Sequence, residues 1–240
     1  MCRFKSGIIL KNKVVVAPGE NDSHSDLLES LGINDDYFGA TNVFVRAELV
    51  PVNNEWWIDP AEEPDKWRFV VDQDMRPEWF DESEHEKVFR KAVCDWWKEH
   101  VLIDQKLEEL SSGYYCLKRC EVKNLLNDVK VLLDSSRVGE MRGSSQVGEM
   151  WGSSQVGEML DSSRVGEMRG ISQVGEMWDS SQVGEMLDSS QVGEMWDSSQ
   201  VVKMWGRSTA RDFKNWPNVK IWVSPEGTFE MVAHQNKSEE

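Results

Sequence analysis

Cys2 is the residue whose type and position could most readily do chemistry, because it directly follows the initiator methionine. A small second residue permits removal of Met1, which would leave a thiol nucleophile beside a free α-amine able to act as its base. The polar residues that could assist such a nucleophile are Asn21, His24, Asp26 and Glu48. The competing interpretation is a structural cysteine buried in the first strand.

The beginning of the chain is similar to that of N-terminal nucleophile amidotransferases, some of which start Met-Cys-Arg, as residues 1–3 do here. Abasic-site crosslinking proteins also use a second-position cysteine, but they continue with a glycine where this chain has Arg3. These resemblances imply an enzyme or a DNA-lesion binder in which His24 and Glu48 assist Cys2. The predicted amino-terminal domain is short for an amidotransferase fold, so this function is the alternative hypothesis.

No other motif indicates catalysis or cofactor binding. The sequence has no Gly-rich phosphate loop, no His-Glu-x-x-His, no Cys-x-x-Cys and no Gly-x-Ser-x-Gly. Cys116 and Cys120 are separated by three residues and lack a second pair of the kind that structural zinc sites use. We therefore predict no cofactor and no metal site.

The second half of the chain repeats nine residues, SSQVGEM followed by two variable positions. A methionine stands three residues after each of eight valines, which are Val138, Val147, Val156, Val165, Val174, Val183, Val192 and Val201. The glycine and two serines of each repeat, at a period that is not helical, argue against a helix. Apolar residues at such strict spacing argue against a disordered linker. The sequence predicts a parallel β-solenoid, in which equivalent residues stack on successive coils at about 4.8 Å.

Each coil should place some side chains in the core and others in solvent. We expect the second serine, the valine and the methionine of each nonamer to point inward, and the glutamine and the residue after the methionine to point outward. Nine residues cannot close a coil, so a coil should contain two or three nonamers. We prefer 18 residues because the inward side chains are small; a coil of 27 would place Trp151, Trp178 and Trp205 in one column.

Two outward sets could form a binding surface. The tryptophans are Trp151, Trp178, Trp196 and Trp205. The glutamates are Glu140, Glu149, Glu158, Glu167, Glu176, Glu185 and Glu194. Like charges stacked at coil spacing repel one another unless solvent screens them or a cation bridges them. These carboxylates are either a row that binds a basic partner or a solvated corner of the coil. The Gly-Gly-x-Gly-x-Asp pattern of calcium-binding β-rolls is absent, which argues against calcium as the bridging cation.

The chain should comprise a small α+β domain at residues 1–112, the β-solenoid at residues 113–207, and a cap and tail at residues 208–240. In the first part we expect a hairpin turning at residues 11–13, a short helix capped by Ser23 or Ser25, strands over residues 42–51 and 66–74, and an amphipathic helix over residues 83–101. The last segment reads as two strands joined by Ser-Pro-Glu-Gly, a hairpin that would cover the open end of the solenoid.

The 240-residue chain is acidic, with a net charge of −16. This charge argues against direct binding of nucleic acid, which requires clustered Lys and Arg, and it permits competition with nucleic acid for a basic partner. Residues 55–86 carry twelve acidic side chains and are the best candidate for an anionic face. The alternative is that these charges only form a solvated surface. We expect no membrane span and no secretory signal. The four scattered cysteines are typical of a reducing compartment, so we expect the cytoplasm.

With the segments MCRFKSGIIL, FVRAEL, KWRFVVDQDMRPEWF and the SSQVGEM nonamers, the chain resembles a group of uncharacterised proteins from gut bacteria and their phages. Members of that group join this kind of amino-terminal domain to nonapeptide solenoids. The resemblance implies an accessory protein of a phage or mobile element, acting in the host cytoplasm and of the sort used against host defences.

Three functions are therefore open. The first is a non-enzymatic interaction protein whose solenoid presents Trp, Leu and Glu rows to a protein partner. That partner could be a nucleic-acid-binding host enzyme inhibited by nucleic-acid mimicry, and the solenoid edge or the Trp face could also support oligomerisation. The second is the Cys2 enzyme or lesion binder, and the third is a structural part of a virion or adhesin.

Overall fold

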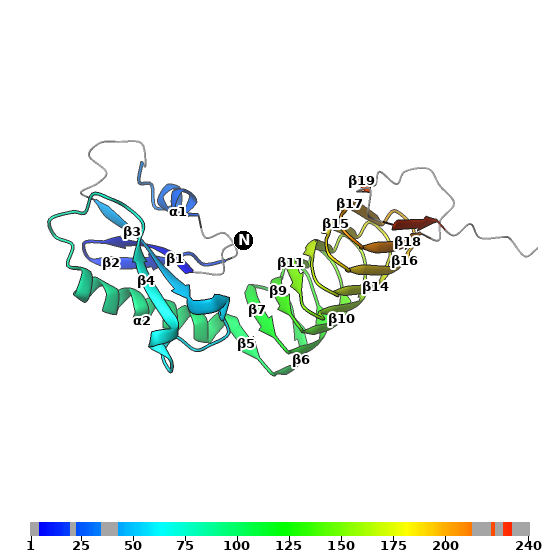
Figure 1. The fold of residues 1–240 in the computed structure, drawn as a ribbon, viewed down its shortest axis with the longest axis horizontal. Helices are drawn as coiled ribbons and strands as arrows, with labels where there is room; N and C mark the ends of the chain where they lie inside the picture. The colour runs from blue at the N-terminus through cyan, green and yellow to red at the C-terminus, as the bar shows by residue number, and fades with distance from the viewer. Residues whose placement is uncertain (1–4, 20–22, 35–42, 213–221, 224–227, 232–240) are drawn as a thin grey trace, which may run out of the picture. The chain divides into compact units, whose positions relative to one another are not determined.

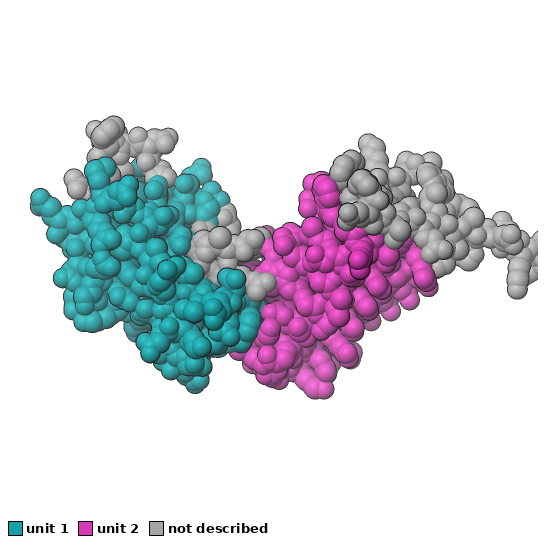
Figure 2. All heavy atoms as spheres, in the orientation of Figure 1, with its two compact units in different colours: residues 1–101 teal, residues 102–240 magenta. Residues whose placement is uncertain are grey.

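The chain forms two compact units, which Figure 2 colours separately: residues 1–101 and residues 102–240. The structure is a computed structural model that describes residues 5–19, 23–34, 43–212, 222–223 and 228–231. The first unit combines a sheet with two helices, and the second is a parallel β-solenoid of about six turns (Figure 1). The predicted α+β domain followed by a β-solenoid is thereby confirmed.

The first unit is built on a four-stranded antiparallel sheet in the order β2-β1-β3-β4. Its strands are β1 (Lys5–Leu10), β2 (Lys13–Val16), β3 (Phe44–Pro51) and β4 (Trp67–Val71). The predicted hairpin is present, since Leu10 pairs with Lys13 across the turn. Short 3-10 turns lie between β3 and β4, at Val52–Asn54 and Pro64–Lys66.

Two helices cover the two faces of this sheet. Helix α1 (His24–Ser30) packs Leu28 against Ile8 and Phe44. Helix α2 (Glu82–His100) lies on the other face, where Phe89 approaches so closely that a Cβ on Gly7 would stand 2.7 Å from its ring. Because β1 alternates its side chains between the faces, neighbouring residues of one strand contact different helices.

The solenoid has two eight-stranded parallel sheets, one on each side of its core (Figure 1). The odd-strand sheet contains β5 (Val101–Ile103), β7 (Tyr114–Lys118), β9 (Lys130–Asp134), β11 (Gln146–Trp151), β13 (Arg164–Met168), β15 (Gln182–Met186), β17 (Gln200–Met204) and β19 (Trp222–Val223). The even-strand sheet contains β6 (Lys106–Leu110), β8 (Glu121–Leu125), β10 (Arg137–Met141), β12 (Gln155–Met159), β14 (Gln173–Met177), β16 (Gln191–Met195), β18 (Thr209–Asp212) and β20 (Thr228–Met231).

One coil of the repeat region contains 18 residues, because equivalent residues pair between strands that are two nonamers apart. Val138 pairs with Val156, and Val156 pairs with Val174. The structure thus has two nonamers per coil, one in each sheet. A column of Trp151, Trp178 and Trp205, which a 27-residue coil would create, does not form.

The core of the solenoid consists of the three inward positions predicted from the repeat. The valines and methionines of the nonamers are at most 3% exposed, and the second serines are at most 5% exposed. The repeat glycine lies between the inward valine and methionine, and a Cβ on Gly175 would stand 2.5 Å from the carbonyl oxygen of Gly157. A side chain at this position of an interior coil would therefore force the neighbouring strands to shift.

The corner after each outward residue adopts a left-handed backbone conformation. Glycine occupies this corner in some coils and aspartate in others, for example Gly170 with φ of 67° and Asp188 with φ of 56°. Left-handed backbone is unfavourable for most residues but tolerated by aspartate. The Asp188 side chain also accepts a hydrogen bond of 2.9 Å from the Gly170 N–H, so these aspartates join adjacent coils.

The ends of the solenoid differ from the sequence-based expectation. It begins with β5 and β6, one coil before residue 113. The sequence did not reveal this coil because its two strands lack the Val-Gly-Glu-Met run of the nonamers. The predicted capping hairpin is wrong: β19 pairs in parallel with β17, and β20 pairs in parallel with β18. The two carboxy-terminal strands lie in different sheets and extend the solenoid. The Ser-Pro-Glu-Gly turn lies outside the described residues.

Candidate functional site

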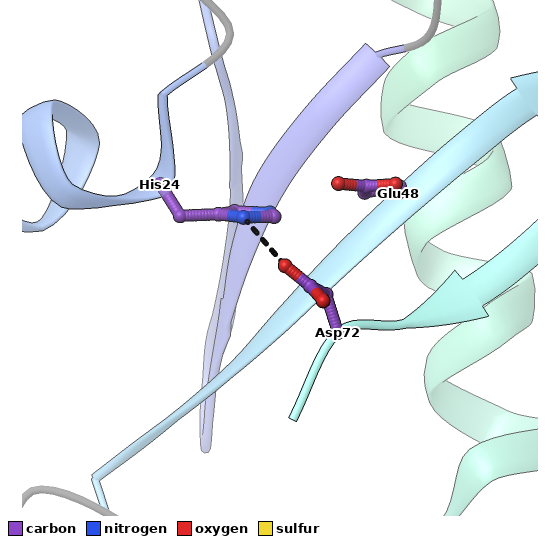
Figure 3. Close-up of side chains that lie close together, drawn as sticks. All are labelled: His24, Glu48 and Asp72. Carbon is purple, nitrogen blue, oxygen red and sulfur yellow. Dashed lines mark ion pairs between the residues drawn. The ribbon is translucent and has the colours of Figure 1, made fainter. Parts of the chain in front are cut away.

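A cluster of three titratable side chains joins three elements of the first unit (Figure 3). His24 is the first residue of α1, Glu48 lies on β3, and Asp72 directly follows β4. One ligand atom from each of the three lies within 4.8 Å of the others. The Ser23 hydroxyl, which accepts a 3.2 Å hydrogen bond from the Asp26 N–H, caps α1 and fixes where His24 begins the helix.

Both ring nitrogens of His24 face oxygen atoms. Nε2 lies 3.2 Å from the Ala47 carbonyl oxygen, and Nδ1 lies 3.4 Å from Asp72 Oδ2. The His24 side chain is 10% exposed, whereas that of Asp72 is 60% exposed. The cluster therefore combines a largely covered imidazole with a solvent-accessible carboxylate, an arrangement that suits cation binding.

The structure brings together two of the residues predicted to assist Cys2, namely His24 and Glu48. Cys2 and Asn21 lie outside the described residues, and Asp26 is in the first turn of α1 but not in the cluster. Asp72 was missed by sequence reasoning. The signal that could have found it is the WRFVVDQD segment, where a polar residue follows a buried strand, but its proximity to His24 depends on the pairing of β4 with β3.

The described cysteines are free thiols with structural surroundings. Burial raises the pKa of Cys120, whose thiol donates a hydrogen bond of 3.2 Å to the Leu102 carbonyl. Burial also raises the pKa of Cys94. Cys116 is 7% exposed. Cys94 and Cys120 are thus held in the protonated, weakly nucleophilic form at neutral pH.

The outward residues of the solenoid form two rows, one along each sheet. The even row is Arg142, Leu160, Trp178 and Trp196, and the odd row is Trp151, Arg169, Leu187 and Trp205. In the even row the rings of Trp178 and Trp196 stack with centroids 5.2 Å apart and planes at 10°. These two rings are half-buried, as is Trp205.

Trp151 belongs to the odd row by its register, but it is only 7% exposed and so does not lie on an open surface as predicted. Strand β11 extends to Trp151, which pairs with Asp134 of β9. The register of these two strands shifts between Val147 and Met150, where the regular nonamers meet the irregular first coils. Trp151 is therefore unsuited to contact a partner in the folded protein.

The glutamates also form two columns, one per sheet, and several of their charges have partners. Arg142 pairs with Glu140 at 2.8 Å. Arg169 likewise pairs with Glu167, and Lys203 pairs with Glu185 at 2.7 Å. Indole N–H groups donate to two more glutamates, from Trp178 to Glu176 at 3.0 Å and from Trp196 to Glu194 at 3.2 Å. Glu158 is exposed and Glu149 is buried. The columns are therefore partly neutralised.

A groove of about 860 Å³ crosses the even-strand sheet from β6 to β18. It lies over the first half of each strand, where the glycines of the repeat provide no side chain; they are Gly139, Gly157, Gly175 and Gly193. The groove and the Trp178–Trp196 stack thus lie along the same strands, at opposite ends of each strand.

These features define the chain as a parallel β-solenoid with 18-residue coils joined to an α+β unit that carries a His-Glu-Asp cluster. Comparisons with models of protein families, with curated proteins and with solved structures gave no match to this chain. None of the helices within the described residues has the length and apolar character needed to cross a membrane.

Proposed function

We propose that the protein is a non-enzymatic interaction protein whose even-strand face binds a macromolecular partner. The observation that carries this proposal is the stacked pair of Trp178 and Trp196, each hydrogen-bonded to a glutamate of its own strand. Tryptophan is the residue most enriched at the energetic centres of protein interfaces. Two rings held on adjacent coils offer such a centre without loss of side-chain freedom on binding.

The scaffold supports this function because hydrogen bonds between its coils hold the backbone under the surface residues in place. Backbone hydrogen bonds link each coil to the next over the whole repeat; Trp178 N–H, for instance, donates to the Met159 carbonyl at 2.9 Å. A surface on such a scaffold is largely pre-formed. Binding would therefore cost little conformational entropy.

The partner that fits best is a protein with a basic surface. The chain carries a net charge of −16, and the even face adds the carboxylates of Glu176 and Glu194 beside the rings. Complementary charge speeds association and makes it sensitive to salt. A nucleic-acid-binding enzyme of a host cell has such a surface, and an accessory protein of a phage or mobile element that meets it in the cytoplasm would act as its inhibitor.

Replacement of both even-row tryptophans tests the proposal. The tagged full-length protein should retain a specific partner from a host lysate, and W178S/W196S should lose it while its circular dichroism stays unchanged. W205S is the matched control, because it removes a half-buried tryptophan from the odd row. Equal capture by W178S/W196S and the wild type would refute the even face as the binding surface. Copurification with virions alone would favour a structural role.

A second function is favoured by one observation: His24 and Glu48, which the sequence suggested as helpers of Cys2, lie together in the structure. A chemistry based on Cys2 requires removal of Met1, which intact-protein mass spectrometry measures directly. Retained Met1 would eliminate the α-amine mechanism. If Met1 is removed, crosslinking of the wild type to abasic-site DNA, with none by C2A, would support the lesion-binding form of this function.

A further inference from the structure

We propose that His24, Glu48 and Asp72 form a binding site for a divalent transition metal ion, with zinc the best-fitting ion. One imidazole and two carboxylates are a donor set that suits zinc. The three residues come from α1, β3 and the end of β4 and converge on one point (Figure 3). This site is separate from the solenoid surface and does not depend on the function proposed for it.

The distances approach those of a tetrahedral site. Ligand atoms held at about 2.1 Å from a tetrahedral zinc ion stand about 3.4 Å apart. His24 Nδ1 and Asp72 Oδ2 are 3.4 Å apart, and no pair of ligand atoms in the cluster is separated by more than 4.8 Å. Asp72 is 60% exposed, so its side chain is free to adjust by the small distance that closing the site requires.

The hydrogen bonding of His24 prepares Nδ1 as a ligand. Nε2 lies 3.2 Å from the backbone carbonyl oxygen of Ala47, which can only accept a hydrogen bond. In the tautomer that donates from Nε2 to this oxygen, Nδ1 presents a lone pair toward Asp72. Histidine ligands of metal sites usually donate their second N–H in this way, which fixes both the tautomer and the ring orientation.

The charges favour a cation. Glu48 and Asp72 bring two carboxylates to one imidazole ring, and paired carboxylates are donors that a divalent cation prefers to a neutral ligand. A divalent ion bound by all three side chains would tie α1 to the sheet. Three protein ligands would leave one tetrahedral position for water or a small molecule, as in catalytic zinc sites.

Titration calorimetry of the EDTA-treated full-length protein with zinc chloride tests the site. We expect one equivalent to bind and to raise the unfolding temperature of the wild type. D72A and H24A should each weaken binding by at least about a hundredfold, because loss of a ligand should cost no less than the roughly 10–100-fold lost with an outer-shell partner. D72A is the decisive variant, because an exposed side chain can be removed without unfolding the domain. D74A, which removes a nearby exposed aspartate outside the cluster, should bind zinc like the wild type.

The visible and near-ultraviolet spectrum of the cobalt-substituted protein distinguishes this site from the thiols. We expect the ligand-field bands of nitrogen and oxygen donors without a thiolate charge-transfer band, and we expect D72A to lose those bands. Absence of zinc binding by the wild type would overturn the proposal. Equal binding by the wild type and D72A, or a thiolate band from Cys94, Cys116 or Cys120, would also overturn it.

Discussion

At the scale of single residues, the buried serines of the solenoid differ in hydrogen bonding although they occupy equivalent positions. The Ser154 hydroxyl donates to the Trp151 carbonyl at 2.6 Å. The Ser172 hydroxyl, one coil further along the same column, is buried without a hydrogen-bond partner among the described residues. A buried hydroxyl without a partner costs free energy, whereas a bonded one contributes to stability.

We therefore predict opposite effects for the same substitution at these two sites. S154A should lower the free energy of unfolding by about 1 kcal/mol, because it removes a made hydrogen bond. S172A should leave stability unchanged or raise it by up to about 1 kcal/mol, because it removes an unsatisfied group. Chemical denaturation of the two variants measures the difference. Equal losses in both would contradict the hydrogen bonding described for this column.

The repeat glycine leads to a second prediction. A Cβ at residue 175 would stand 2.5 Å from a backbone oxygen of the preceding coil, so G175A should lower the free energy of unfolding by about 1–3 kcal/mol through overpacking. Q173A, two residues earlier on the same strand and exposed, is the control and should have little effect. The last copy has Val202 at this position, which shows that one strand of the solenoid accommodates a side chain there. If G175A has the same free energy of unfolding as the wild type, interior coils can move apart enough to accommodate the added methyl group at little cost.

At the scale of elements, ion pairs between neighbouring strands differ by their burial. Lys118 on β7 pairs with Asp134 on β9 at 2.6 Å, and the side chains are 13% and 10% exposed. We predict that K118M lowers the free energy of unfolding by about 3–5 kcal/mol, because Asp134 would keep a buried charge without its partner. Thermal unfolding measures the loss.

The matched control is the exposed pair between β6 and β8, in which Lys106 lies 2.7 Å from Glu121. K106M should change the unfolding temperature little, because water screens that pair. A loss in K106M as large as in K118M would mean that burial does not set the strength of these pairs.

The elements show which parts of the structure the sequence could predict. The strands and their inward serine, valine and methionine followed from the period, because every copy repeats the same local pattern. The first coil was missed because Val101–Ile103 and Lys106–Leu110 lack the Val-Gly-Glu-Met run of the nonamers. The cap was misread because two strands joined by a turn look alike in sequence whether they pair with each other or with a preceding coil.

The candidate sites were less predictable than the fold. Burial of Trp151 depends on the irregular pairing of β11 with β9, which no nonamer contains. The position of Asp72 beside His24 depends on three elements that are distant in sequence. The separation of the tryptophans into two rows follows from the number of residues per coil, and the sequence alone left both 18 and 27 open.

At the scale of the whole molecule, the solenoid should tolerate the loss of one complete coil. Deletion of residues 155–172 removes one strand from each sheet and joins Ser154 to Gln173 in the original register. Because a repeat array is stabilised by nearest-neighbour interfaces, this variant should keep its β circular dichroism and unfold cooperatively at a somewhat lower temperature. Deletion of residues 155–166 is out of phase and should disrupt the sheets. Equal behaviour of the two deletions would contradict the coil register.

The two units pose separate questions of function. The solenoid face with Trp178 and Trp196 is a candidate protein interface, and the His24 cluster is a candidate metal site. W178S/W196S should lose partner binding and keep zinc binding. D72A should lose zinc binding and keep an intact solenoid. The two proposals therefore succeed or fail independently.

The coil length determines the rows, the groove and the paired glutamates, and chemical bridging of introduced cysteines measures it most directly. Gln155 and Gln173 are partners on adjacent strands, so Q155C/Q173C should react with dibromobimane, which fluoresces only after bridging two thiols. Q155C/Q182C, with cysteines 27 residues apart and in different sheets, should give no bridged product in peptide mapping. Bridging in Q155C/Q182C together with none in Q155C/Q173C would contradict the 18-residue coil.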